Sequence, residues 1–254
     1  MRNRIELTAS VPRAPATGQL TYASGTRTLA TTPSRILRDS SVTSFSPDSA
    51  PCFQVGFVDD CSNRSADSAP FCPAVLAAVL VDFRGSSVRL TWSELRGATG
   101  NLSYRLLVLN PDNSVLRSLP IASGNTYVDA APPATSQQVR YRLEVTGSGL
   151  PGLSYSNIAS VTRRLEAFVP TAFTPNGDGL NDVLEVKGRF LKTYRFTVAD
   201  RNGQEVFQST NSSQTWDGRV RNQAPVPGSF VWRFEAIDEA GQLVVQRGTV
   251  TIVK

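Results

Sequence analysis

Apolar and polar residues alternate along this chain in short stretches, most clearly from residue 85 onward. Alternation with a period of two predicts half-buried β-strands, and no long stretch places apolar residues at helical spacing. The predicted strands of this region are SVRLTW (87–92), SYRLLVLN (103–110), VLRSLP (115–120), NTYVDA (125–130), QVRYRLEVT (138–146) and LSYSNIASVTR (153–163). Strands at this spacing are typical of a Greek-key sandwich. We expect its core to contain Trp92 and three residues of one late strand, Tyr141, Leu143 and Val145.

The same pattern occurs a second time, 88 residues upstream. FQVGF at 53–57 has the alternation of YRLEV at 141–145, and Ser68 and Ser156 are separated by the same offset. A period of this length is that of one sandwich domain, so two tandem copies are expected. The upstream copy is short, and its first strand is hard to find. We therefore expect it to be incomplete and the chain to begin inside a domain.

A third region of strands and turns follows. Its first part, FVPTAFTPNGDGLNDVLEV (168–186), concentrates Gly, Asn and Asp between two apolar runs. YRFTVADRNGQEVFQS (194–209) predicts a hairpin around 201–203, since Asn-Gly favours a tight turn. The predicted fold class is all-β, with tandem immunoglobulin- or fibronectin III-like β-sandwiches. Three modules are expected, at 1–74 (incomplete), 75–165 and 166–254.

Composition and charge narrow the functions that this fold can carry. The net charge is +5, but the basic residues are almost all Arg and are scattered, whereas nucleic-acid sites concentrate them on one face. The chain has no His and three Cys, which excludes the usual Ser-His-Asp and Cys-His catalytic sets, His-ligated metals and a four-thiolate zinc site. No GxxxxGK[ST] phosphate loop occurs. We expect no nucleic-acid partner, no enzyme activity in these residues and no cofactor.

Neither a membrane span nor an export leader is predicted. AVLAAVLV (74–81) is too short to cross a bilayer, and MRNRIELTAS at the start has no apolar segment behind its charges. The chain is therefore either cytosolic or a C-terminal piece of a longer protein, and the incomplete first copy favours the second. GSGLPG (147–152) fits a dinucleotide-binding motif, but Pro151 lies within it and a strand-like segment follows it, so we expect a hairpin loop.

The three cysteines cluster within CFQVGFVDDCSNRSADSAPFC. A hairpin centred near Ser62 would place Cys52 opposite Cys72, both directed outward, at a distance that suits a cross-strand disulfide. Cys61 would lie in the loop, free or paired with chain upstream of this sequence. The alternative is three reduced thiols in a cytosolic protein. We favour the disulfide, which requires an oxidising compartment.

In pattern, the two copies resemble fibronectin type III-like modules of large secreted bacterial surface proteins. The C-terminal resemblance is more specific. PTAFTPNGDGLNDVLEVKG, NGQEVFQS, WDGR, PVPGSFVWRFEAID and GTVTIVK resemble, in this order, the gliding motility-associated C-terminal domain, which is the type B sorting domain of the Bacteroidetes type IX secretion system. The matching positions, the signature residues, are Phe173, Pro175, Asn176, Gly177, Asp178, Gly179, Asn181, Asp182, Trp216, Asp217, Gly218, Gly228, Gly248 and Thr249. Asn202 departs from the family, in which an aromatic residue often precedes the hairpin glycine.

This resemblance implies a folded module that is recognised at the outer membrane after export across the inner membrane. The implied partners are the type IX outer-membrane translocon and a PorP/SprF-type outer-membrane barrel, and the implied location is the cell surface or the medium. A β-module can be recognised by strand addition to an exposed edge, and TVTIVK (249–254) is a candidate edge. The chain would then be the end of an adhesin-like surface protein with an unknown extracellular ligand. The alternative is the tail of a secreted hydrolase whose catalytic domain lies upstream.

The same C-terminal signature raises the question of a metal site. Four of its side chains could offer oxygen ligands to calcium: Asn176, Asp178, Asn181 and Asp182. The EF-hand spacing fails, however, and Asx side chains also satisfy the backbone donors of a loop. We favour that structural role and expect no metal.

A short motif suggests a modification of the first module. DSA at 48–50 and again at 67–69 resembles the Asp-Ser/Thr-apolar motif for O-glycosylation of exported Bacteroidetes proteins, with Ser49 and Ser68 as acceptors. A tripeptide arises easily by chance. Unmodified serines are therefore favoured.

Overall fold

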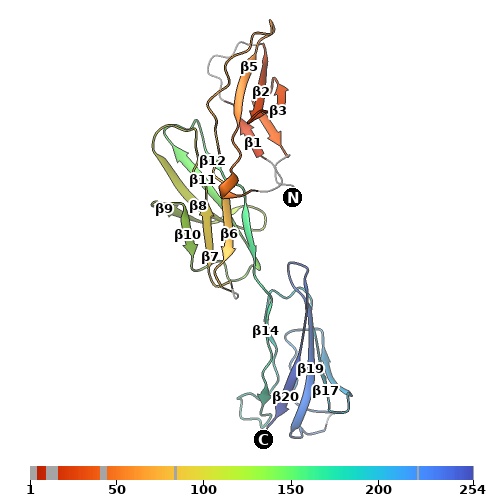
Figure 1. Cartoon of the computed structure of the whole chain (residues 1–254). Helices are drawn as coiled ribbons and strands as arrows, with labels where there is room; N and C mark the ends of the chain where they lie inside the picture. The colour runs from red at the N-terminus through yellow and green to blue at the C-terminus, as the bar shows by residue number, and fades with distance from the viewer. Residues whose placement is uncertain (1–4, 10–16, 41–44, 83–84, 222, 254) are drawn as a thin grey trace. The chain divides into compact units, whose positions relative to one another are not determined.

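The computed structural model describes residues 5–9, 17–40, 45–82, 85–221 and 223–253 (Figure 1). In these ranges every regular element is a β-strand except one short 3₁₀-helix, which confirms the all-β fold class. Contacts divide the chain into two units, 1–132 with 139–161, and 133–138 with 162–254. Parts of the predicted first module (1–4, 10–16 and 41–44) and Lys254 of the candidate edge lie outside the described residues. No helix in the described ranges is long and apolar enough to span a membrane.

The described residues of the N-terminal part of the first unit form five strands and the 3₁₀-helix. They are β1 (Ile5–Thr8), β2 (Gln19–Ser24), β3 (Arg27–Thr32), β4 (Ile36–Asp39), η1 (Pro47–Ser49) and β5 (Gln54–Val58). β2 lies between β3 and β5 in an antiparallel sheet, and β1 pairs with β4. The buried apolar cluster of this part, among the described residues, is small and consists of Ala9, Leu20 and Tyr22.

The remainder of the first unit is a sandwich of two sheets. It contains β6 (Leu76–Leu80), β7 (Val88–Trp92), β8 (Leu102–Leu109), β9 (Val115–Ile121), β10 (Thr126–Asp129), β11 (Gln138–Gly147), β12 (Ser154–Tyr155) and β13 (Ala159–Thr162). One sheet has the order β10-β7-β6, and the other has the order β12-β11-β8-β9, with β13 also paired to β11. Trp92 of the first sheet is buried in one cluster with three residues of the second, Tyr141, Leu143 and Val145, which confirms the predicted core.

The glycine-rich motif at 147–152 lies in the loop between β11 and β12. The N–H of Leu150 donates to the carbonyl of Gly147 (3.1 Å), and the chain then enters a strand. A phosphate-binding motif of this type needs a helix at this point. The predicted hairpin loop is therefore confirmed.

The offset of 88 residues recurs in the hydrogen bonds of the first unit. The hydroxyl of Ser68 accepts a hydrogen bond from the N–H of Val55 (3.1 Å), and the hydroxyl of Ser156 accepts one from the N–H of Leu143 (2.9 Å). In return, each serine N–H donates to the carbonyl of the same partner (2.9 Å in both). A serine hydroxyl thus replaces one ladder acceptor in both copies, a local use of this side chain.

The second unit is organised around two long strands. Its strands are β14 (Glu166–Phe168), β15 (Ala172–Phe173), β16 (Lys187–Arg189), β17 (Arg195–Ala199), β18 (Glu205–Ser209), β19 (Gly228–Ile237) and β20 (Leu243–Ile252). The main sheet has the order β15-β20-β19-β17-β18, with β15 parallel to β20 and the other pairs antiparallel. β14 pairs with β16 in a small second sheet.

The predicted hairpin at 201–203 joins β17 to β18. The carboxylate of Asp200 accepts hydrogen bonds from the N–H groups of Asn202 (2.8 Å) and Gln204 (2.9 Å), and Gly203 has a φ of +81°. Asn202 is exposed. Because Asp200 and Gly203 supply the turn, an aromatic residue at position 202 is not needed to form it.

Candidate functional site

The Gly- and Asn-rich segment between β15 and β16 is held in shape by its own side chains. The carboxylate oxygens of Asp182 accept hydrogen bonds from the N–H groups of Gly177 (2.6 Å) and Gly179 (2.7 Å). The N–H of Thr174 donates to the carbonyl of Asn181 (2.8 Å) and closes the base of the loop. Hydrogen bonds to a charged acceptor are the stronger kind. Asp182 therefore organises the residues that precede it.

Asn176 and Asp178 complete the loop. The side-chain oxygen of Asn176 accepts from the N–H of Asp178 (3.1 Å), and its Nδ2 donates to Oδ2 of Asp178 (2.9 Å). Oδ1 of Asp178 accepts from the N–H of Leu180 (2.8 Å). The hydrogen bonds from Asn176 and Leu180 favour the charged carboxylate, so the pKa of Asp178 lies below its ordinary value.

The four calcium candidates all lie in this loop, but the carboxylate oxygens among them already have partners. Both oxygens of Asp178 and of Asp182 accept hydrogen bonds from the loop itself. Asn181 contributes its backbone, with a φ of +55°. Among the described residues, no group of three or more Cys, Asp or Glu side chains is arranged to hold a metal ion. These contacts support the structural role of the Asx side chains.

Gly177 and Gly179 are required by the backbone of the loop. Their φ angles are +81° and +86°, a region that other residues rarely adopt. A Cβ at either position would meet no atom within 4 Å. Any cost of substitution there arises from backbone conformation and not from a clash.

Three signature residues form a packed group beside the loop. Phe173 and Trp216 are both 2% exposed, and their ring centroids are 5.6 Å apart. Trp216 exchanges two backbone hydrogen bonds with Leu184 (2.8 and 3.1 Å), in the segment after the loop. Gly218 has a φ of +81°, and a Cβ there would lie 3.3 Å from Cζ of Phe173. The loop is thus attached to an aromatic core at both of its ends.

The remaining signature residues serve the sheet and its turns. Trp232 of β19 covers Gly248 of β20, since a Cβ at Gly248 would lie 2.5 Å from Cζ2 of the indole ring. An aromatic side chain over a strand glycine is a known device for pinning register. The others lie at turns or on strands: Pro175 in the loop, Asp217 after Trp216, Gly228 at the start of β19 and Thr249 on β20.

A buried polar network involves residues that sequence reasoning missed. Gln137 is 1% exposed, and its Nε2 donates to the carbonyl of Arg163 (2.8 Å) and to the carboxylate of Asp238 (2.6 Å). Its Oε1 accepts from the N–H of Ala240 (2.8 Å). Burial raises the pKa of Asp238, but the hydrogen bonds from Gln137 and from the backbone at 240–242 outweigh it and hold that pKa below its ordinary value. No local pattern links these positions, so the sequence carries no signal for them.

The end of the C-terminal strand is covered. The N–H of Thr251 donates to the carbonyl of Thr171 (2.9 Å), and the N–H of Val253 donates to the carbonyl of Phe173 (3.0 Å). On its other side, β20 pairs with β19 over its whole length. The expectation that 249–254 forms an exposed edge is therefore wrong for its last described residues, because the short parallel strand β15 lies there.

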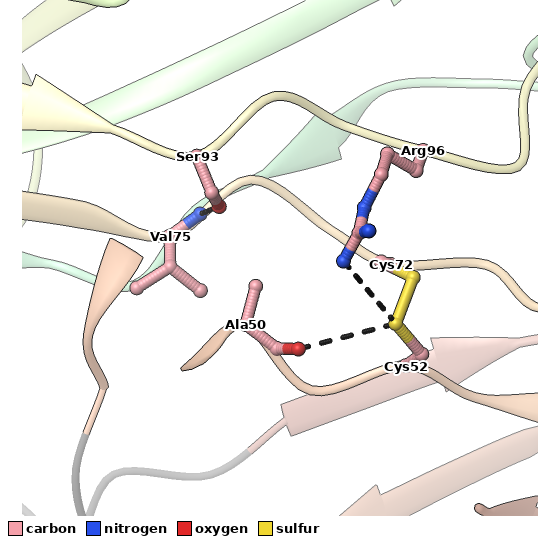
Figure 2. Close-up of a disulfide and its surroundings, with 6 residues drawn as sticks. All are labelled: Ala50, Cys52, Cys72, Val75, Ser93 and Arg96. Carbon is pink, nitrogen blue, oxygen red and sulfur yellow. Dashed lines mark hydrogen bonds between the residues drawn. A yellow bond between two sulfur atoms is a disulfide. The ribbon is translucent and has the colours of Figure 1, made fainter. Parts of the chain in front are cut away.

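Figure 2 shows the disulfide between Cys52 and Cys72, which confirms the predicted pairing. The connecting hairpin turns where the N–H of Ser62 donates to the carbonyl of Asp59 (3.0 Å). The predicted outward direction of Cys72 is wrong: the residue is 4% exposed, because its backbone pairs with that of Arg96 (2.9 and 3.0 Å). Cys61 is exposed and free within the described part of the chain.

The two DSA serines differ in the environment of their hydroxyl groups. Ser49 ends η1 and is exposed, and its hydroxyl makes no hydrogen bond to the described residues. The hydroxyl of Ser68 accepts from Val55 (3.1 Å) and donates to the carbonyl of Ala69 (3.1 Å). A glycan on Ser68 would remove the donor of the second bond. Ser49 is the more accessible acceptor of the two.

The fold and the loop define the class of protein: an all-β chain of sandwich modules that ends in a Gly- and Asx-rich module. The family model described as "CHU_C Type IX secretion signal domain" matches residues 167–252, which include every signature residue. The C-terminal region is therefore a type IX secretion signal domain, as the sequence resemblance predicts. This signal implies an exported protein, either secreted or at the cell surface.

Comparisons with other proteins give weaker likenesses. A tetra-tandem repeat from the extending region of a large adhesion protein is similar at 12% identity, over 93% of this chain and 67% of that chain, with a TM-score of 0.33. A two-domain fibronectin type III segment of chicken tenascin is similar at 13% identity, over 70% and 98%, with a TM-score of 0.35. The BSP domain of a biofilm-associated protein is similar at 12% identity, over 81% and 42%, with a TM-score of 0.25. A search of curated proteins found no significant match.

Proposed function

We propose that this chain is the C-terminal part of an adhesin-like surface protein, in which residues 166–254 are the export address. The modules at 1–74 and 75–165 are then non-catalytic spacer or binding modules. The partners of the address are the type IX outer-membrane translocon and a PorP/SprF-type outer-membrane barrel. The observation that carries this proposal is the self-supported loop on the Phe173–Trp216 pair, within the matched family range.

The loop has the properties of a recognition surface. Leu180 lies between Gly179 and Asn181 and is 71% exposed, although it is a large apolar residue. Asp178 accepts a hydrogen bond from the N–H of Leu180 itself, and Asp182 accepts one from the N–H of Gly179 before it. The carbonyl of Asn181, after it, accepts one from the N–H of Thr174. A rigid loop that presents an apolar side chain loses little conformational entropy when a partner binds. This arrangement supports recognition of a folded shape.

The address can be tested with a fluorescent protein. Residues 166–254 are fused behind a secretory signal peptide and the fluorescent protein, in a host with type IX secretion. We expect fluorescence outside the outer membrane, and retention in the periplasm when residues 166–254 are removed. Leu180→Ala in the fusion should reduce export without lowering the melting temperature of the module, since Leu180 is exposed. Export of the fusion without residues 166–254 would contradict the proposal.

The class of the whole protein is a separate question. A secreted hydrolase with its catalytic domain upstream would carry the same C-terminal address. The open reading frame upstream of residue 1 decides between the two, because an adhesin-like protein continues with further sandwich modules.

Intact-mass analysis of peptides from the native source tests glycosylation. If any DSA serine is modified, we expect Ser49 and not Ser68, because the hydroxyl of Ser68 is engaged in the strand ladder.

A further inference from the structure

The long strand β20 has an edge that is open over most of its length. Successive residues of a strand direct their N–H and C=O groups alternately to the two sides. The N–H groups of Thr251 and Val253 donate to the carbonyls of Thr171, which precedes β15, and of Phe173 in β15. The backbone N–H and C=O groups of the odd-numbered residues of β20 are therefore directed away from β19. By this alternation, the backbone groups of Val245, Arg247 and Thr249 face the same side. No described residue forms a backbone hydrogen bond with them there.

The other edge of the same sheet has the usual protection against further pairing. β18 is five residues long, and its pairing with β17 contains an irregularity between Val198 and Ala199. Short length and bulges are the means by which natural edge strands avoid adding a partner. β20, by contrast, is ten residues long, pairs with β19 without any register shift and contains no Pro. The two edges of one sheet are therefore not equivalent.

The side chains along this open edge indicate which residues a partner strand would need in order to complement them. Leu243 and Val245 are 68% and 42% exposed on the outer face. Arg247 is also exposed and forms no ion pair with a described residue. Its direct cross-strand neighbour is Arg233, which binds Glu235 (2.6 Å). A carboxylate opposite Arg247 would compensate this charge, since opposite charges on facing strands attract.

We propose that β20 is the recognition edge of the export address. An extended segment of the outer-membrane secretion machinery adds to it as a strand along residues 243–249, with a carboxylate opposite Arg247 and apolar side chains beside Leu243 and Val245. The inference rests on the proposed export function of 166–254. The added strand continues the line that β15 already occupies at residues 251–252.

A second copy of this chain does not meet the same requirement. Residues 243–249 read LVVQRGT and contain no Asp or Glu. In an antiparallel pair of two β20 strands, Arg247 would face an uncharged residue or another Arg247. In the first case the charge of Arg247 would stay uncompensated, and in the second the two arginines would repel each other. Both cases favour a different, acidic partner.

The test uses the full chain behind a secretory signal peptide in a type IX-competent host. Val245→Pro removes an outward N–H and obstructs strand addition, while the hydrogen bonds to β19 remain, because edge positions tolerate proline. Gln208→Pro is the matched control on the edge of β18, where residue 208 faces away from β17 by the same alternation. We expect exported protein to fall about tenfold for Val245→Pro and to stay unchanged for Gln208→Pro. The melting temperatures of both purified variants should stay close to that of the wild type.

Arg247→Glu tests the charge on a side chain that is exposed and does not support the fold. Export should fall several-fold, and Arg201→Glu, in an exposed turn, should have no effect. Normal export of folded Val245→Pro overturns the inference and leaves the address intact. If Val245→Pro does not fold, unchanged export of Arg247→Glu overturns it. Export of the chain without residues 166–254 would contradict the proposal that these residues direct export. The wild type could also form a dimer that Val245→Pro dissociates without loss of export, and this result would show that the edge of β20 binds a second copy of the chain.

Discussion

The N-terminal part of the first unit and the second unit are both small β-structures, but they are stabilised in different ways. In the described residues, the first has a buried apolar cluster of three residues, whereas that of the second has twelve. The first contains the Cys52–Cys72 disulfide, and the second contains no Cys at all. The second instead packs Trp216 against three phenylalanine rings, with centroids 5.0 to 6.3 Å away.

The difference shows two solutions to one physical problem. In a small module, the buried apolar surface only narrowly offsets the conformational entropy that folding removes. A disulfide reduces that entropy in the unfolded chain, whereas aromatic packing adds favourable contact in the folded one. Formation of a disulfide is therefore not needed for the C-terminal unit to fold. Five changes test this comparison.

The largest effect is expected from the aromatic core. Trp216→Ala should lower the free energy of unfolding of the second unit by about 3–5 kcal/mol, because it removes a large side chain that is 2% exposed. Scanning calorimetry of the full chain should show a shift of one transition only. Phe168→Ala, at a residue that is 66% exposed, is the control and should change little. Equal effects of the two substitutions would contradict the packing argument.

The disulfide should have the next largest effect, on the other region. Joint replacement of Cys52 and Cys72 by Ala removes a bond between residues 20 apart in sequence. The expected loss is about 3 kcal/mol, because the unfolded chain gains loop entropy. The transition of the second unit should stay unchanged in the same scan. Cys61→Ser is the control, since that thiol is exposed and free, and a comparable loss there would contradict the assignment.

The loop glycines should have a smaller effect. Gly177→Ala should cost about 1–2 kcal/mol, since an Ala must adopt a φ near +81°. Gly152→Ala is matched in space, because neither Cβ would meet an atom within 4 Å, but its φ is not positive. Urea denaturation should show destabilisation only for the first. If Gly177→Ala is as stable as the wild type, the backbone argument fails.

Acid should weaken the second unit through Asp178 and Asp238. Their pKa values in the folded protein are lowered from 3.8 by hydrogen bonds to the charged carboxylates. A depressed pKa contributes stability that is present above the unfolded pKa and is lost as pH falls through the folded one. The melting temperature should therefore hold between pH 7 and about pH 5 and fall below about pH 4. Asp178→Asn should show a smaller fall over that range, and an unaltered profile would exclude this carboxylate as a cause.

The smallest effect is expected from calcium. The carboxylates of Asp178 and Asp182 already accept hydrogen bonds from the loop, so adding calcium to chelated protein should leave the melting temperature within error. Differential scanning fluorimetry is sufficient to measure this. A rise of several degrees would show that the loop is a metal site and would reverse the structural interpretation.

Local patterns in the sequence were sufficient to predict many of the strands and turns of the molecule. The alternation of QVRYRLEVT predicts β11 and its buried face, the Asn-Gly pair predicts the hairpin at 201–203, and the glycines of NGDGLND have the positive φ angles that their loop suggests. Residue periodicity and turn chemistry depend on a few neighbouring residues, so they can be recognised in the sequence without the tertiary structure. The module boundaries at 74 and 165 stay a prediction.

Other features depended on which distant segments meet. Cys72 is buried because its backbone pairs with that of Arg96. The end of β20 is covered because Thr251 bonds to Thr171. The hydrogen bond between Gln137 and Asp238 joins residues that are 101 apart in sequence. The edge of β20 that is open among the described residues likewise follows from the order of strands in the sheet. From residue 85 onward, the sequence alone determined most of the segments that become strands and turns, because those preferences are local. Only the tertiary structure decided which backbone groups remain without a partner, because strand order is set by the packing of the whole core.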